Sequence, residues 1–189
     1  TVASATGAAH LLGNKGGIVA KMTVGSTSLA FVSCHLAAHT EHLERRNSDC
    51  NEVLRETRRG IGHPKLDACC EHDHVIWLGD LNYRLDPSLD KDHAAYRLDG
   101  DHAEVLAKIS SAVNASSSAA GAASGEEDSW AALHRIDQLK VAQARGEAFS
   151  GFREGVLAHA PTFKVERKVG FHYKDQRVPS WCDRVLWKS

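Results

Sequence analysis

The stretch "VIWLGDLNYRLD", residues 75–86, decides how this chain is interpreted. Its first four residues, Val75 to Leu78, predict a short strand that is apolar on both faces, as in the middle of a covered sheet. The strand runs directly into a glycine, a carboxylate at Asp80 and, two residues later, a carboxamide at Asn82. With a period of two, both side chains can point the same way. They either cap a turn or act on a ligand, and the stretch alone leaves both alternatives open.

The composition indicates one globular domain, or a large piece of one. The chain has 189 residues, and 42% of them are hydrophobic, which is enough for a core. The net charge of −1 provides no global field for nucleic acid or membrane, so any anion site must be built locally. No apolar run is long enough for a membrane-spanning helix, and no signal peptide is recognised. The five cysteines share no repeated spacing, so we expect reduced thiols in a cytoplasmic protein.

Strand-like and helix-like segments alternate, which predicts a layered α/β or α+β domain. The predicted strands cover residues 18–24, 29–35, 75–78 and 184–187, the first two joined by a turn at 25–28. The predicted helices cover residues 41–59, 101–113 and 130–145. Helix 41–59 has a thin apolar stripe and balanced charges, so we expect a surface helix whose charges are mostly solvated. The Ser/Ala/Gly-rich segment 114–129 predicts a low-complexity loop insertion.

Two segments before this central stretch carry candidate functional groups. "GNKGG", residues 13–17, predicts a turn whose backbone can approach a ligand closely, with Lys15 as a cation or simply as an exposed loop lysine. "SCHLAAH" places His35 at the end of a strand, aimed at a cleft or held as a structural histidine. His39 would share a metal with His35 only if this segment were helical, and we expect a strand. "CCEHDH", residues 69–74, lacks a zinc-binding spacing.

Two segments near the end of the chain carry further candidates. "APTFK" presents Lys164 after a stiff extended segment, as a ligand-binding cation or as an exposed loop charge. "RVPSWCDRVLW" leads a turn into a short strand, with Asp183 and Arg184 at its entrance. These two charged residues form either part of a site or a simple ion pair. Trp181 and Trp187 are expected to anchor the core.

Together and in this order, these segments closely resemble the catalytic domain of the inositol polyphosphate 5-phosphatases. The segments that carry the resemblance are "GNKGG", "FVSCHLAAH", "RRN", "WLGDLNYR", "APTFK" and "RVPSWCDRVLW". This family belongs to the Mg²⁺-dependent superfamily that includes DNase I and the apurinic endonucleases. The resemblance extends from about Gly7 to Trp187, and the wording of the sequence is plant- or algal-like. It implies a four-layered DNase I-like α/β sandwich of two mostly antiparallel sheets flanked by helices, present here as a partial domain over residues 1–189.

The resemblance also implies roles for individual residues. Asp80 would activate the attacking water, Asn82 would orient the scissile phosphate, and His35 would contact it and stabilise charge on the leaving side. Asp183 would orient a catalytic histidine. Candidate groups for the substrate's phosphates are Asn14, Lys15, Arg84 and Lys164. The "RN" at Arg46 and Asn47 would be architectural.

The resemblance places two further parts of the active site outside these residues. The family's Mg²⁺-binding glutamate lies upstream of "GNKGG", and its catalytic histidine lies downstream of "WCDRVLW". We therefore expect a chain truncated at both ends, with Mg²⁺ as the cofactor of the complete domain and weak or no activity as a fragment. Val165 stands where the family usually has an aromatic residue, and "KVGFHYKDQR" replaces a more basic run. Both departures leave the preferred inositide open.

The leading hypothesis is hydrolysis of the 5-phosphate of phosphoinositide lipids or soluble inositol polyphosphates, with peripheral membrane contact in the case of a lipid. A nuclease of the same superfamily is the first alternative, although the near-neutral charge argues against a long nucleic-acid footprint. A non-catalytic paralogue that binds inositides is the second.

Overall fold

The structure is a computed structural model of residues 1–189. It describes residues 1–5, 15–89, 107, 131–169, 172–174 and 177–189. The predicted insertion at 114–129, the predicted helix at 101–113 apart from its seventh residue, and the candidate Asn14 lie outside the described residues. The chain divides into two compact units. The first comprises residues 1–82, 146–155 and 183–189, and the second comprises residues 83–145 and 156–182.

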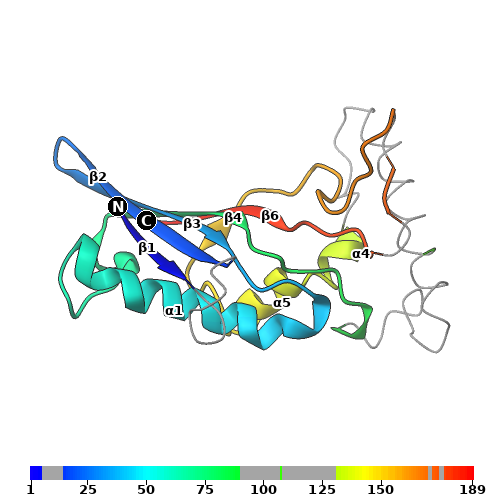
Figure 1. Ribbon diagram of the computed structural model, residues 1–189, viewed down its shortest axis with the longest axis horizontal. Coiled ribbons are helices and arrows are strands. Elements are labelled where there is room, and N and C mark those ends of the chain that lie inside the picture. The colour runs from blue at the N-terminus through cyan, green and yellow to red at the C-terminus, as the bar shows by residue number, and fades with distance from the viewer. Residues whose placement is uncertain (6–14, 90–106, 108–130, 170–171, 175–176) are drawn as a thin grey trace. The chain divides into compact units, whose positions relative to one another are not determined.

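A mixed sheet of six strands forms the first unit, in the order β1-β2-β3-β4-β6-β5 (Figure 1). The strands are β1 (Val2–Ala5), β2 (Gly16–Val24), β3 (Thr27–His35), β4 (His74–Asp80), β5 (Arg153–Glu154) and β6 (Asp183–Lys188). Strands β3 and β4 are parallel, and the other neighbours are antiparallel. The predicted α/β class is confirmed. Within the described part of the chain this is the only sheet, and the predicted two-sheet sandwich has no second sheet there.

The predicted hairpin is present, with longer strands and a tighter turn than expected. Only two residues separate β2 from β3, and the first of them, Gly25, has a φ of 61°, which a glycine adopts without strain. The carboxylate of Asp73 accepts hydrogen bonds from the backbone N of Ser28 (2.8 Å) and from its hydroxyl (2.7 Å). These bonds tie the start of β3 to the loop that precedes β4.

Helix α1 (Leu43–Ile61) lies along one face of the sheet, beside β1 and β2 (Figure 1). A 3₁₀ turn, η2 (Thr40–His42), precedes it, so the helix begins two residues later than predicted. Its buried face combines Val53 with several polar groups. The buried residues of α1 are Arg46, Asp49, Cys50, Val53 and Thr57. Arg46 and Asp49 are therefore exceptions to the mostly solvated charges predicted for this helix, and both bond the loop after β3.

The start of the "CCEHDH" segment lies in a short helix, α2 (Ala68–Glu71). Asp67 caps its first turn, accepting hydrogen bonds from the backbone N of Cys69 (2.9 Å) and of Cys70 (3.2 Å). All five cysteines of the chain are free thiols. No helix in the described ranges is long and apolar enough to cross a membrane.

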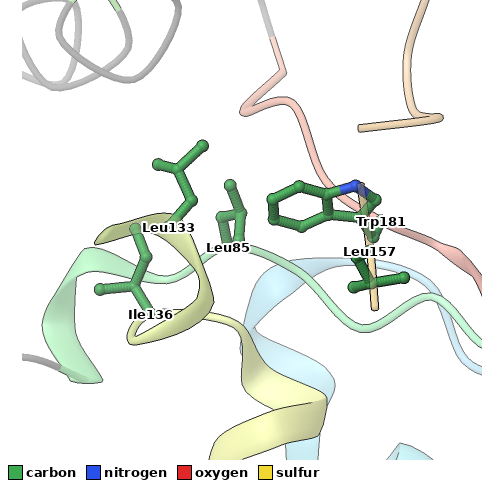
Figure 2. Close-up of a cluster of buried hydrophobic side chains, with 5 residues drawn as sticks. All are labelled: Leu85, Leu133, Ile136, Leu157 and Trp181. Carbon is green, nitrogen blue, oxygen red and sulfur yellow. The ribbon is translucent and has the colours of Figure 1, made fainter. Parts of the chain in front are cut away.

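The second unit has its own apolar core (Figure 2). Its buried members are Leu85, Leu133, Ile136, Leu157 and Trp181. The indole of Trp181 is fully buried, and its N–H donates to the backbone O of His159 at 2.9 Å. The prediction that Trp181 anchors the core is confirmed. Trp187, in the first unit, is only half-buried, with the guanidinium of Arg153 5.9 Å above its ring.

The helix predicted at 130–145 is two helices, α4 (Ala131–His134) and α5 (Gln138–Ala144). The break lies at Asp137, which is extended (φ −75°, ψ 116°) and caps α5 by accepting from the backbone N of Lys140 at 3.0 Å. Asp137 also forms a β-bridge with Leu85, just before the 3₁₀ turn η3 (Pro87–Leu89). The local sequence is compatible with one continuous helix. We therefore attribute the break to the pairing of Asp137 with the distant Leu85.

Candidate active site

The register of the sheet brings four residues into one row at the end of the strands. Gly16 pairs with His35, His35 pairs with Asp80 of the parallel neighbour, and Asp80 pairs with Asp183 of the antiparallel neighbour. Paired residues project from the same face of a sheet. The Nε2 atom of His35 lies 3.4 Å from the Oδ2 atom of Asp80. Three candidates that are far apart in sequence, His35, Asp80 and Asp183, therefore share one side of the sheet.

Gly79 permits the close approach of β4 to β3 at this row. Its φ is 129°, and a Cβ atom there would lie 2.1 Å from the backbone O of Cys34. Any side chain would push the strands apart beside His35 and Asp80. The sequence analysis did not predict this role for Gly79. The signal for it was the position of the glycine, directly before the carboxylate of Asp80.

Asp80 and Asn82 are joined to each other, but not through strand periodicity. Strand β4 ends at Asp80, and Asn82 is in a left-handed conformation with a φ of 55°, so the period of two no longer applies. The backbone N of Asn82 donates to the Oδ1 atom of Asp80 at 3.1 Å. The side-chain Nδ2 of Asn82, which is buried, donates to the backbone O of Leu36 at 3.0 Å. The turn-capping interpretation is correct for the backbone, and it leaves Asp80 oriented beside His35.

Lys15 adds a positive charge to this row. Its ammonium group contacts the Nε2 atom of His35, the atom that also faces Asp80. Lys15 and His35 line a shallow depression of about 600 Å³ over the ends of β1, β2 and β3, together with Ser33 and the backbone of Gly16. An anion at this edge would meet one fixed cation and one imidazole.

The two glycines that follow Lys15 line this depression and also pack closely against neighbouring elements. Both belong to β2 rather than to a turn. A Cβ atom on Gly16 would lie 2.1 Å from the backbone O of Ser4, and one on Gly17 would lie 2.7 Å from Val53 of α1. They make room for the neighbouring strand and for the helix, so the glycine signal reports packing in the described residues.

The carboxyl group of Asp80 has a raised pKa. Burial is the largest cause, and the nearby carboxylate of Asp183 raises the pKa further. The protonated form of His35, the backbone N–H of Asn82 and the charge of Lys15 act in the opposite direction. A carboxylate with a raised pKa is a stronger proton acceptor than an ordinary aspartate, which suits a general base.

This arrangement predicts a pH dependence. A base must be ionised to accept a proton, so activity should fall as the pH drops through the raised pKa of Asp80, above the usual aspartate range. Asp183→Asn removes a like charge and should move this acid limb to lower pH, whatever it does to the maximum rate. The measurement is kcat/KM against pH for the full-length protein and the variant. A limb that stays in place or moves to higher pH would contradict the coupling of the two carboxylates.

The possible ion pair between Asp183 and Arg184 is not what the structure contains. Asp183 is exposed, whereas Arg184 is buried and projects from the other face of the sheet. Arg184 pairs instead with Glu154 of β5, with distances of 2.6 Å (Nε to Oε1) and 2.7 Å (Nη2 to Oε2). This bidentate pair anchors β6, and Asp183 remains on the side of His35 and Asp80.

Arg84 and Lys164 belong to the second unit, where both lie at the ring of Phe163. The guanidinium carbon of Arg84 lies 4.0 Å from the ring centroid, and the Nζ atom of Lys164 lies 6.0 Å from it. Arg84 is buried, whereas Lys164 is exposed. Of these two predicted cations, only Lys164 presents its side chain openly to a ligand.

The described residues do not form a complete metal site. They contain no group of three or more His, Cys, Asp or Glu side chains placed to hold a metal ion. His39 does not join His35, because β3 ends at His35 and His39 has a left-handed φ of 75° instead of a helical one. The carboxylates of Asp80 and Asp183 are suitable oxygen donors for a hard cation, but alone they are too few.

Known proteins share both the sequence and the fold of this chain. The chain is 33% identical over 192 residues to the mouse type II inositol 1,4,5-trisphosphate 5-phosphatase, covering 97% of this chain and 16% of the relative. It is 36% identical over 190 residues to the type I inositol polyphosphate 5-phosphatase 4 of Arabidopsis thaliana, covering 93% of this chain and 29% of the relative. The chain therefore spans less than a third of the length of these two relatives.

A solved structure agrees with this relationship. The inositol polyphosphate 5-phosphatase domain of a synaptojanin, in complex with inositol (1,4)-bisphosphate and a calcium ion, matches with a TM-score of 0.67 and 25% identity. The match covers all of this chain and 46% of that one, and it confirms the DNase I-like fold. The family described as Endonuclease/Exonuclease/phosphatase family 2 matches residues 1–189. With its sheet, its row of polar residues and this match over its whole length, the chain belongs to the Endonuclease/Exonuclease/phosphatase family 2, alongside the inositol polyphosphate 5-phosphatases.

Proposed function

We propose that the protein to which this chain belongs hydrolyses the 5-phosphate of inositol polyphosphates or phosphoinositides. The observation that carries the proposal is the row at the end of the sheet, in which Lys15 contacts His35 and His35 lies 3.4 Å from Asp80. The similarity to named 5-phosphatases supports the reaction class. The inositol (1,4)-bisphosphate held by the synaptojanin domain has no 5-phosphate, as expected for the product of such a reaction.

In the proposed reaction, Asp80 accepts a proton from the water that attacks phosphorus, and the new P–O bond forms as the bond from phosphorus to the 5-oxygen of the inositol breaks. The 5-oxygen leaves with the bonding electron pair and takes up a proton from solvent, which gives an inositol hydroxyl and inorganic phosphate. The N–H of Asn82 orients this carboxylate, and the hydrogen bond from its carboxamide to Leu36 fixes the carboxamide where it can hold the phosphate. Lys15 and His35 donate to phosphate oxygens as negative charge builds up in the transition state. Asp183 raises the basicity of Asp80 and, as the family resemblance implies, orients a histidine.

Mg²⁺ is part of the proposal for the complete protein. The calcium ion bound in the synaptojanin domain supports a divalent metal. Such an ion would neutralise phosphate charge during attack. The described residues alone supply too few ligands to hold it. Treatment of the full-length protein with EDTA should lower phosphate release at least about tenfold, and Mg²⁺ should restore it.

The test is phosphate release by the full-length protein from a panel of soluble inositol phosphates and of phosphoinositides in vesicles. Release only from compounds with a 5-phosphate supports the proposal. Comparison of the rates for soluble inositol phosphates and for phosphoinositides in vesicles shows which class is the better substrate. Nicking of plasmid DNA without action on inositides would instead indicate the nuclease. Inositide binding without turnover would indicate the non-catalytic paralogue.

Lys164 is expected to contribute to substrate binding. Because its ammonium group is exposed beside Phe163, Lys164→Ala should raise KM about tenfold and change kcat little, as for the loss of one charged hydrogen bond. Lys168→Ala, which removes an exposed lysine paired with Glu166, is the matched control and should leave KM unchanged. Steady-state kinetics of phosphate release measures both. Equal KM values for the two variants would remove Lys164 from the site.

We also propose that the protein acts in the cytoplasm, at membrane surfaces if the substrate is a lipid. The five free thiols support a reducing compartment. Cell fractionation of the full-length protein tests the proposal, and recovery in a secreted or luminal fraction would contradict it.

A further inference from the structure

The loop that follows β3, residues Leu36–Thr40, connects the candidate site to helix α1, and we call it the His35 loop. Its first residue is bonded twice to the site. The backbone N of Leu36 donates to the backbone O of Asp80 at 3.0 Å, and its backbone O accepts from the carboxamide of Asn82 at 3.0 Å. The position of the loop therefore affects the end of β3, the end of β4 and the carboxamide of Asn82.

Arg46 of α1 forms hydrogen bonds with the rest of this loop. Its side chain is fully buried, and its guanidinium donates to three backbone carbonyls of the loop. The Nη1 atom bonds the O atoms of Ala37 (3.0 Å) and His39, and the Nη2 atom bonds the O atom of Thr40 (3.2 Å). A buried guanidinium is costly unless it is hydrogen-bonded, so Arg46 and the loop depend on each other.

Asp49, one helical turn further along α1, holds the same loop as a hydrogen-bond acceptor, whereas Arg46 is a donor. Its Oδ2 atom accepts from the backbone N of Ala37 at 3.2 Å. Its Oδ1 atom lies 2.7 Å from the Nε atom of Arg45, although burial raises the pKa of this carboxyl. The N–H of Ala37 thus bonds Asp49, and its C=O bonds Arg46.

The backbone conformation of the loop shows why such support is needed. His39 has a φ of 75°, which residues other than glycine adopt at a cost. Arg46 bonds the carbonyls on either side of Ala38, and one of them belongs to His39 itself. These bonds therefore stabilise the backbone conformation that the loop adopts after His35.

We propose that Arg46 and Asp49 are positioning residues, which fix the His35 loop and thereby the separation of His35 from Asp80 and the orientation of Asn82. The catalytic part of this inference rests on the proposed function. Displacement of reacting groups by about 1 Å can cost about 10²-fold in rate. Loss of the hydrogen bonds from Arg46 and Asp49 should therefore lower kcat more than it raises KM, because the cation Lys15 beside His35 is retained.

The test compares Arg46→Lys and Asp49→Asn with Arg55→Met in the full-length protein. Arg55 is a matched control because it is an exposed arginine on the same helix, paired with Glu56 at the surface. We expect Arg46→Lys to lower kcat about 10- to 100-fold with KM within about threefold, and Asp49→Asn to act in the same direction. Amide exchange should become faster in the His35 loop but not at Ser28, which Asp73 holds at the far end of β3. Arg55→Met should change none of these quantities.

Two results would overturn the inference. One is unchanged exchange of the loop amides in a folded Arg46→Lys protein, and the other is faster exchange with unchanged kcat. If Arg46→Lys does not fold, Asp49→Asn decides by the same two measurements. If the wild type releases no phosphate from any inositide, the proposed function fails separately. The imidazole NMR signals of His35, measured in the same variants, then decide the positioning claim, and signals identical to those of the wild type would contradict it.

Discussion

Asp80→Asn is expected to lower the rate of phosphate release by the full-length protein about 10³-fold, within the range for loss of a general base. The substitution keeps the shape of the side chain, and its Oδ1 atom can still accept from the N–H of Asn82. It removes the group that accepts the proton from water. Steady-state phosphate release under saturating substrate measures the effect. Glu44→Gln, an exposed carboxylate change on α1, is the control and should retain the full rate.

The same substitution should not destabilise the protein. Because the pKa of Asp80 is raised in the folded state, its ionised form opposes folding at neutral pH. The favourable contribution is present below the pKa of the unfolded chain and is lost as the pH rises through the folded pKa. Asp80→Asn should therefore unfold at the same temperature as the wild type or higher at pH 7. A slower enzyme that also melts earlier would point to structural damage rather than to loss of a base.

Arg184→Met is expected to lower the free energy of unfolding by about 3–5 kcal/mol, because it leaves the carboxylate of Glu154 buried without its partner. The pair is bidentate and almost fully buried, with side-chain exposures of 0% for Arg184 and 6% for Glu154. Chemical denaturation followed by tryptophan fluorescence measures the change. Arg55→Met removes one member of an exposed pair and should cost less than about 1 kcal/mol.

A double substitution separates the ion pair from the space that it fills. Arg184→Met combined with Glu154→Leu removes both charges, and it should recover most of the stability that the single change loses. If the double variant is as unstable as the single one, packing rather than an unpaired charge determines the cost. Either outcome leaves Asp183 intact, since it lies on the other face of the sheet.

The parts of the fold that sequence predicted correctly are those with strong local signals. The apolar strand at 75–78, the hairpin and the helix after it follow from periodicity and from turn residues. Strand β1 was not predicted, because Val2–Ala5 is four small residues without alternation and is a strand only through its pairing with β2. The break at Asp137 was missed for the same reason, since a β-bridge to Leu85 determines it.

The sequence indicated candidate residues for the site but not their geometry. Nothing local in the sequence shows that His35, Asp80 and Asp183 occupy one row, because the register of three strands sets that arrangement. Sequence adjacency was misleading for Arg184, whose partner is 30 residues away on β5. The charge pattern of the helix was equally uninformative for Arg46, which is buried against the His35 loop, and only the family resemblance indicated an architectural role for it.

The most direct test of the central claim follows the atoms of the released phosphate. Full-length protein is incubated with inositol 1,4,5-trisphosphate in water enriched in ¹⁸O, ³¹P NMR identifies both products, and mass spectrometry of each product locates the label. The expected products are inositol 1,4-bisphosphate without label and inorganic phosphate that carries one solvent ¹⁸O, both formed about 10³-fold more slowly by Asp80→Asn. Removal of the 1- or 4-phosphate, label in the inositol product, or undiminished turnover by Asp80→Asn would contradict the central claim.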